Sequence, residues 1–106
     1  MTMTAAIRTD GEGYLIDPAD WTEDVARALA EREGIAMTEE HWDVCRFMRA
    51  YWEDHRIAPD ARFVVRHLKE KRGAHRDRLF ELFPYGYVQQ ACKIAGMKRP
   101  RAWSTG

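Results

Sequence analysis

The two cysteines are the residues of this 106-residue chain best suited to covalent chemistry, because a thiolate can attack an electrophile or carry sulfur. Cys45 and Cys92 lie far apart and match neither a CxxC motif nor a zinc-ligand spacing, so each is judged alone. Cys45 falls on the apolar face of an expected helix. Cysteine in such a position behaves as a small hydrophobic residue, and we expect Cys45 to be part of the core.

Cys92 stands in a more cationic stretch of the chain than Cys45. The basic residues that follow it are Lys93, Lys98, Arg99 and Arg101. Because nearby positive charge lowers the pKa of a thiol, the sequence predicts that Cys92 is the more reactive cysteine and is alkylated faster than Cys45. A structural role stays open, since Ala91, Ile94 and Ala95 could bury the same helix face.

Other kinds of catalytic chemistry find no support in the sequence. The four histidines show no metal-ligand spacing, and neither a glycine-rich phosphate loop nor a GxSxG motif occurs. We expect no metal and no cofactor, and we expect His67 to lie at the edge of the core.

Charge is unevenly distributed although the formal net charge is zero. Residues 1–58 hold 6 Lys/Arg and 13 Asp/Glu, whereas residues 59–106 hold 11 and 4. The stretch 62–78 alone carries seven Lys/Arg over two expected helices, an outline compatible with a helix-turn-helix. Zero net charge argues against it, so DNA binding is not favoured.

The hydrophobic pattern and the turn residues divide the chain into short elements. A glycine-assisted turn within residues 5–16 predicts a β-hairpin. Capping residues and apolar spacing predict helices over residues 22–33 and 38–55, from Pro59 to Gly73, over RDRLFELF, and over YVQQACKIA up to Gly96. The predicted fold is mainly α: a compact helical bundle of about five helices with an N-terminal β-hairpin. Residues 1–96 form the single domain, and residues 97–106 form a flexible C-terminal arm.

The ends and the hydropathy of the chain bear on its location. No window reaches the roughly 18 consecutive apolar residues of a membrane span, and the N-terminus does not resemble a secretion signal. We expect a cytoplasmic protein that does not enter a membrane.

Several stretches together resemble one family. They are DGEGYLIDPADW, GIAMTEEHW, IAPDAR, LFELFP and QQACKIAGMKRP. The chain is similar over nearly its whole length to the DsrC/TusE sulfur-relay proteins, which include the gamma subunit of dissimilatory sulfite reductase. The resemblance implies a helical bundle with an N-terminal hairpin and a C-terminal arm.

The resemblance also identifies a departure at a decisive position. In this family the arm ordinarily carries a cysteine at its penultimate position, about eleven residues after the one that matches Cys92, and that terminal thiol takes up sulfur as a persulfide. Here the eleventh residue after Cys92 is Trp103, and Tyr87 and Gln89 stand where the family usually has a proline and a lysine. The resemblance therefore implies a divergent member that lacks the terminal acceptor.

The sequence is compatible with two functions. The first is a sulfur-relay protein that holds or exchanges sulfur through Cys92 alone, without full carrier activity. Its expected partners are sulfur-transfer proteins or a sulfite reductase-type complex, with a relay for transfer-RNA thiolation as one pathway. Whether the protein is an enzyme is left open.

The second function is a non-catalytic regulatory or partner-binding protein. In both cases the binding element would consist of Trp103 and the basic residues that follow Cys92, with Trp103 as an anchor. An alternative for Trp103 is that it packs onto its own domain.

Overall fold

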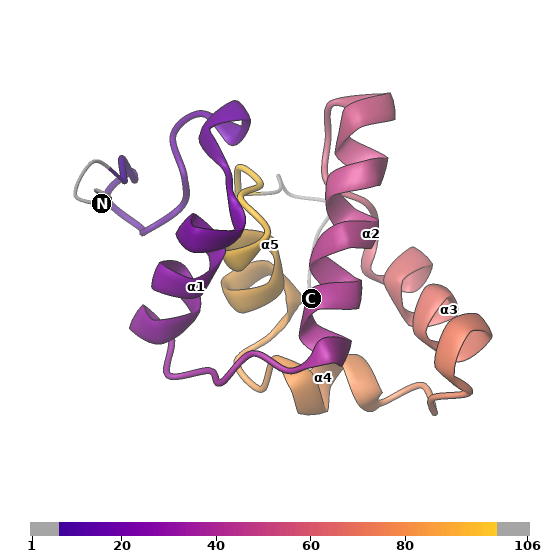
Figure 1. The fold of residues 1–106 in the computed structure, drawn as a ribbon. Helices are drawn as coiled ribbons and strands as arrows, with labels where there is room; N and C mark the ends of the chain where they lie inside the picture. The colour runs from indigo at the N-terminus through magenta and orange to yellow at the C-terminus, as the bar shows by residue number, and fades with distance from the viewer. Residues whose placement is uncertain (1–6, 100–106) are drawn as a thin grey trace.

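The computed structural model describes residues 7–99, and their regular secondary structure is helical (Figure 1). In chain order the elements are a 3-10 turn (Pro18–Asp20), α1 (Glu23–Arg32), α2 (Glu39–His55), α3 (Ala61–Arg72), α4 (Arg78–Leu82), a π-helical turn (Tyr87–Ala91) and α5 (Cys92–Ile94). The predicted bundle of about five helices is confirmed for this part of the chain. None of the described helices combines the length and the apolar content that a membrane span requires.

The predicted N-terminal β-hairpin is wrong, because no β-strand forms within residues 7–99. The segment is instead a tight turn, in which the Asp10 carboxylate accepts hydrogen bonds from the backbone N–H groups of Glu12 and Tyr14 at 2.8 and 3.0 Å. A single antiparallel bridge joins Thr9 to Leu15. The glycine-assisted turn was therefore located correctly, but no pair of strands extends from it.

No strand follows this turn, because a 3-10 turn begins directly after it, at Pro18. Asp17 caps the 3-10 turn by accepting a hydrogen bond from the backbone N–H of Ala19, and Pro18 begins that turn. Proline lacks the N–H that a strand would donate to its neighbour. Backbone pairing between the two sides of the turn is therefore limited to the single bridge between Thr9 and Leu15. We name the segment of residues 8–16 the N-terminal turn.

The helix ends follow the capping residues seen in the sequence. The Thr22 hydroxyl accepts a hydrogen bond from the Val25 N–H at the start of α1, and the Asp60 carboxylate accepts one from the Arg62 N–H at the start of α3. Gly73 ends α3 in the left-handed conformation, with φ +65°. Local signals thus set these boundaries.

The last helical segment is less regular than the sequence predicts. It begins as a π-helical turn, in which the Cys92 N–H donates to the Tyr87 carbonyl five residues earlier, and continues as α5. Gly96 ends it with φ +76°, and a Cβ at this position would lie 2.4 Å from Cδ1 of Trp21. A glycine is therefore required here both by backbone conformation and by the close approach of the indole.

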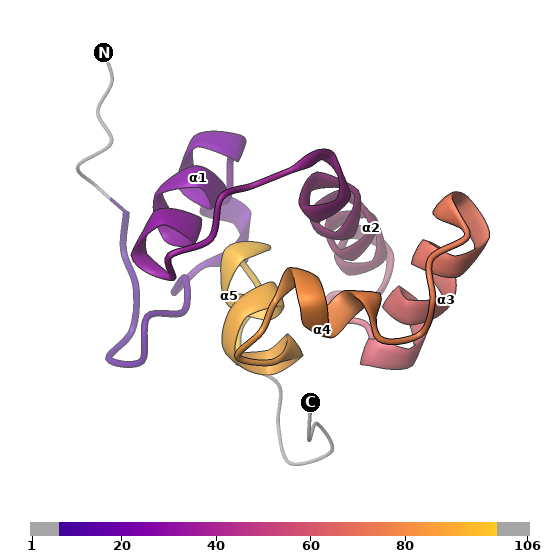
Figure 2. The same ribbon diagram turned by 90° about the horizontal axis from the view of Figure 1, so that it is seen from below.

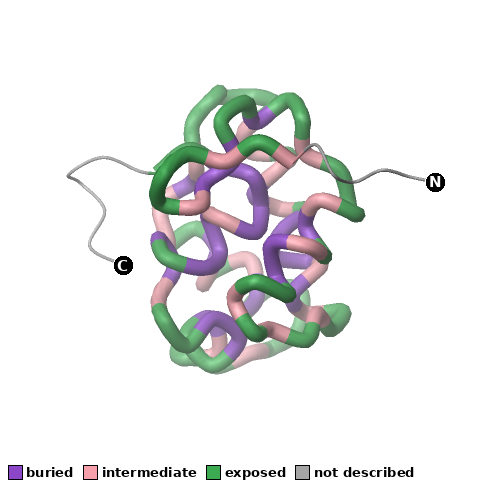
Figure 3. Tube along the Cα trace, turned by 90° about the vertical axis from the view of Figure 1, so that its left-hand side faces the viewer, coloured by how far each residue is buried: buried purple, intermediate pink, exposed green. Residues whose placement is uncertain are grey.

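The π-helical turn and α5 lie in the middle of the molecule, between α1 on one side and α2 with α3 on the other (Figures 1 and 2). Buried residues line the inward faces of all these elements, as the purple segments of the tube show (Figure 3). The core includes both cysteines and large side chains such as Tyr14, Phe83 and Tyr87. Cys92 therefore belongs to the central segment of the fold.

Candidate functional site

Cys92 lies at the junction of the π-helical turn and α5, and its side chain is inside the protein. Its exposed fraction is 0%, and it is a free thiol. The hydroxyl of Tyr87 lies beside the thiol, and that hydroxyl donates its proton to the backbone carbonyl of Pro59 in a short hydrogen bond. The sulfur is thus enclosed by core side chains.

Tyr14 of the N-terminal turn also packs close to Cys92. Its hydroxyl donates a 2.9 Å hydrogen bond to the backbone carbonyl of Val88, one helical turn before the cysteine. The Tyr14 ring is 1% exposed, and its pKa is raised, first by burial and then by the neighbouring Cys92 thiol. The N-terminal turn therefore covers the site, a role that the sequence did not indicate for the tyrosine in DGEGYLID.

Burial raises the pKa of the Cys92 thiol to about 12, and the nearby Tyr87 hydroxyl lowers it by less. The expectation of a lowered pKa is wrong for this conformation. Burial also raises the pKa of Cys45 to about 12, so ionisation gives no reason for Cys92 to react faster than Cys45. In the enclosed site Cys92 is a protonated thiol at neutral pH.

Lys93 does not supply the expected positive charge to the thiol, because its ammonium group is engaged elsewhere. The Nζ atom lies 3.2 Å from Oε2 of Glu33 and 5.1 Å from the centroid of the Tyr14 ring. Glu33 also accepts a 3.3 Å hydrogen bond from the buried amide of Gln90. Glu33, which follows the last residue of α1, therefore contacts two side chains that flank Cys92, and nothing in the sequence pattern indicated this role.

The other predicted binding residues begin the C-terminal segment. Lys98 and Arg99 are exposed, and Nε of Arg99 lies 3.8 Å from Oε1 of Glu12 in the N-terminal turn. Arg101 and Trp103 lie outside the described residues, as does most of the predicted arm. Lys93 thus contacts the Tyr14 ring, and Arg99 contacts Glu12, both of the N-terminal turn. Lys98 forms no ion pair with a residue of the described range 7–99.

Cys45 and His67 lie where the sequence placed them. Cys45 is completely buried in the core, and the His67 ring is half-buried and stacks on Phe47 with 4.5 Å between the ring centroids. His41, in contrast, is buried and bridges two elements: its Nδ1 accepts from the Thr38 N–H, so its Nε2 carries the proton that it donates to the Leu82 carbonyl. No cluster of three metal-binding side chains occurs among the described residues.

The basic stretch 62–78 is partly neutralised by ion pairs. Four of its seven Lys/Arg residues have acidic partners: Arg62 with Asp60, Lys71 and Arg72 with Asp43, and Arg78 with Glu40 and Glu81. Such pairing reduces the positive potential that attracts a phosphate backbone. The stretch therefore offers less to DNA than its sequence suggests.

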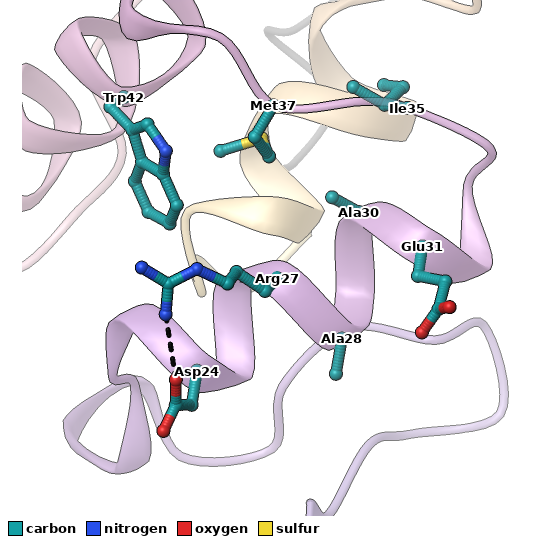
Figure 4. A pocket seen from close by; sticks show the side chains of 8 residues that line it. All are labelled: Asp24, Arg27, Ala28, Ala30, Glu31, Ile35, Met37 and Trp42. Atoms are coloured by element: carbon teal, nitrogen blue, oxygen red, sulfur yellow. Dashed lines mark hydrogen bonds and ion pairs between the residues drawn. The ribbon is translucent and has the colours of Figure 1, made fainter.

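A surface pocket lies between α1 and α2, away from Cys92 (Figure 4). It is lined by Asp24, Arg27, Ala28, Ala30, Glu31, Ile35, Met37 and Trp42. Arg27 lies across it, with its Nη1 2.8 Å from Oδ1 of Asp24 and its guanidinium carbon 5.2 Å from the centroid of Trp42. The pocket contains no cysteine and none of the predicted site residues, so it is separate from the candidate site.

Comparison with known proteins identifies the family to which this chain belongs. A family model described as DsrC like protein matches residues 2–102. The chain is 43% identical over 97 residues to sulfurtransferase TusE of Pectobacterium atrosepticum, an alignment that covers 89% of each chain.

Two solved structures have the same fold. The oxidised gamma subunit of dissimilatory sulfite reductase (DsrC) from Archaeoglobus fulgidus superposes with a TM-score of 0.84 at 36% identity, over 91% of this chain and 90% of that one. DsrC of Allochromatium vinosum gives a TM-score of 0.77 at 38% identity, over 89% and 87%. This chain belongs to the DsrC-like family.

Proposed function

We propose that this protein acts in sulfur relay, holding or exchanging sulfur through the single thiol of Cys92. The proposal extends to this chain what the names of its relatives, sulfurtransferase TusE and DsrC, say of those proteins. The observation that carries the choice of residue is the position of Cys92: it lies in the central segment of the fold, a few residues before the C-terminal segment begins. Cys45, in contrast, lies in the middle of α2 and does not adjoin the C-terminal segment along the chain.

The chemistry requires only one thiol. The Cys92 thiolate attacks the outer sulfur of a donor persulfide, the sulfur–sulfur bond of the donor breaks, and the donor leaves as a thiolate that takes up a proton. Cys92 then carries the persulfide, with no net oxidation or reduction. The family resemblance implies a second cysteine at the position of Trp103, and this chain has none there. We therefore propose that Cys92 works without a second thiol on the arm and that carrier activity is reduced.

Burial sets a condition on this function, because a closed thiol with a pKa of about 12 neither ionises at neutral pH nor meets a donor. The N-terminal turn is held over the site by the Tyr14 hydroxyl, by the Lys93 contact with the Tyr14 ring and by the Arg99–Glu12 pair. Apart from the buried Tyr14 and Leu15, the residues of this turn are exposed or half-buried, and such segments open at lower free energy than the centre of a core. We infer that displacement of this turn exposes Cys92.

The C-terminal segment would then supply the docking element. We propose that the arm 97–106, through Lys98, Arg99, Arg101 and Trp103, together with Lys93 of α5, binds sulfur-transfer proteins or a sulfite reductase-type complex. Two of these residues, Lys93 and Arg99, also hold the cover in place. A partner that engages them would therefore loosen the N-terminal turn as it binds. A relay that ends in transfer-RNA thiolation is one pathway that we propose for this protein, beside sulfite metabolism.

Sulfur loading followed by intact-protein mass spectrometry tests this proposal. The protein is incubated with a cysteine desulfurase, cysteine and a persulfide-carrying relay protein. We expect a mass gain of one sulfur atom in the wild-type chain and in Cys45→Ser, and no gain in Cys92→Ser. Loading that survives in Cys92→Ser would refute the assignment of the thiol.

A second function, a non-catalytic partner-binding protein, is favoured by one observation. Cys92 is as deeply buried and as weakly acidic as the core residue Cys45. In this case Trp103→Ala should weaken capture of a purified relay partner, whereas Cys92→Ser should leave capture intact and wild-type protein should take up no sulfur. The two functions thus differ in the response to the same pair of variants.

A further inference from the structure

The hydroxyl of Tyr87 is placed within reach of both the Cys92 sulfur and a backbone carbonyl. It donates a hydrogen bond to the carbonyl of Pro59, and it lies beside the Cys92 thiol. Both Tyr87 and Cys92 are 0% exposed. Among residues 7–99, Tyr87 is the side chain whose hydrogen bond acts on the pKa of Cys92, and it lowers that pKa. The contact therefore favours the ionised form of the sulfur.

The π-helical turn explains how Tyr87 comes to lie beside Cys92. The turn closes with a bond from the Cys92 N–H to the Tyr87 carbonyl, five residues earlier. In an α-helix the side chains that share a face are three or four residues apart, so residues five apart point in different directions. An i→i+5 turn is wider and brings the fifth residue back to the same side, and such turns occur frequently at functional sites. The irregular backbone thus has a chemical consequence, the placement of a phenol against the thiol.

The Tyr87 hydroxyl keeps its proton at neutral pH and well above it. The pKa of Tyr87 is raised first by burial, then by the neighbouring Cys92, and further by Asp60 at the start of α3 and Tyr51 of α2. A phenol that stays protonated does not act as a base towards the thiol. Its effect on the sulfur is therefore the donation of a hydrogen bond.

This hydroxyl has one proton and two acceptors within its reach. A hydroxyl proton rotates about the carbon–oxygen bond to suit its surroundings. While Cys92 is a neutral thiol, the Pro59 carbonyl receives the proton. Once the sulfur is negatively charged, a hydrogen bond to it is charge-assisted and roughly twice as strong as one between neutral groups. The hydroxyl then gains by turning from the carbonyl to the sulfur.

We propose that Tyr87 donates a hydrogen bond to the negatively charged sulfur of Cys92, first in the thiolate that attacks a donor and then in the ionised persulfide that results. The persulfide part of this proposal rests on the sulfur-relay function proposed above. Because Tyr87 belongs to the same helical segment as Cys92, it remains beside the sulfur when the N-terminal turn is displaced.

The Tyr87 proton stays on its own oxygen during the exchange. The Cys92 thiol loses its proton to solvent, and the thiolate takes the outer sulfur of the donor persulfide. The donor leaves as a thiolate that takes up a proton, so the exchange needs no oxidant and no reductant. Tyr87 therefore lowers the free energy of the charged states without being consumed.

The pH profile of alkylation tests the role of Tyr87 without any sulfur donor. Iodoacetamide reacts with the thiolate, so the rate at which Cys92 is labelled follows its ionised fraction. Loss of a hydrogen bond to a charged group in Tyr87→Phe should move the midpoint of the profile up by about one pH unit and slow labelling at pH 7 about tenfold. A purely structural role predicts the opposite. Loss of the Pro59 bond would loosen the fold, which speeds labelling and leaves the midpoint unchanged.

Tyr14→Phe is the matched control for this measurement. It also removes a buried hydroxyl that donates to a backbone carbonyl, that of Val88, but this hydroxyl contributes no hydrogen bond to the Cys92 pKa. The control variant should speed the labelling of Cys92 without moving the midpoint. Cys45, measured in the same samples, reports opening of the whole domain and should keep its wild-type rate in both variants.

Tyr87→fluorotyrosine covers the case in which Tyr87→Phe does not fold. The fluorinated phenol keeps the hydroxyl and nearly the same size, and it is a stronger hydrogen-bond donor because it is more acidic. Its midpoint should lie below that of the wild type. An unchanged midpoint in either Tyr87 variant, faster labelling in Tyr87→Phe, or an equal shift in Tyr14→Phe would each overturn the proposal. Wild-type protein that takes up no sulfur would instead refute the relay function, so the two failures are distinguishable.

Discussion

Replacing Tyr14 by phenylalanine tests whether the N-terminal turn controls access to Cys92. The substitution keeps the buried ring and removes only the hydroxyl, which donates the 2.9 Å hydrogen bond to the Val88 carbonyl. Because the core packing is retained, the variant should fold, while the turn loses one of the contacts that hold it in place.

The size of the effect follows from two quantities. Burial raises the pKa of Cys92 from 9.0 to about 12, so the closed state holds about a thousandfold less thiolate at neutral pH than an ordinary thiol. Alkylation must therefore pass through an open state. A buried neutral hydrogen bond contributes about 1 kcal/mol net, so its loss should raise the population of that open state about fivefold.

The assay is alkylation of the native protein with iodoacetamide at pH 8, with each cysteine quantified in its own peptide. We expect Cys92 to be labelled about fivefold faster in Tyr14→Phe than in the wild type, and Cys45 to be unchanged because α2 does not take part in this opening. Equal acceleration at both cysteines would mean that the whole domain opens. Wild-type labelling of Cys92 at the rate of an unfolded chain would refute the account of its burial.

Three further predictions concern the stability of the fold. Asp43→Asn should lower the free energy of unfolding at pH 7 by about 1.5–3 kcal/mol, because Arg72 loses a charged acceptor; urea titration measures this. Burial raises the Asp43 pKa but the bonds from its basic partners lower it more, so the difference from wild type should shrink as pH falls below 3.8 through the lower folded value. Burial lowers the pKa of His41, so its neutral form favours the folded state, and His41→Gln should reduce the loss of melting temperature that accompanies acidification below pH 6.5. Gly96→Ala should lower the free energy of unfolding by at least about 1 kcal/mol, since a Cβ meets Trp21 and the φ is positive; a small thermal shift would contradict the packing described there.

The helices were predictable because their signals are local. Thr22 and Asp60 cap helix starts, Gly73 and Gly96 end helices, and each of these acts within one turn of its own position. The hairpin was not predictable in the same way, since a turn signal fixes the reversal of the chain but not the pairing beyond it. Asp17 and its following proline redirect the chain into a 3-10 turn before strands can form.

The candidate site shows the same division between local and long-range information. The sequence placed Cys92 beside the C-terminal segment, but its ionisation is controlled by burial in the core, to which Tyr14 from the other end of the chain contributes. The positive charge of Lys93 is taken by Glu33, a residue that sequence spacing does not connect to it. An arginine such as Arg49, flanked by indoles from two elements, also becomes visible only in three dimensions.

Residue-resolved mapping of sulfur on wild-type protein is the most direct test of the central claim. After exposure to a persulfide donor and blocking of persulfides, peptide mass spectrometry would locate the added sulfur. The account predicts persulfide on the peptide that contains Cys92, an unmodified Cys45, and faster loading in Tyr14→Phe than in the wild type. Sulfur on Cys45, or a Cys92 that stays unmodified even when the tyrosine hydroxyl is removed, would contradict it.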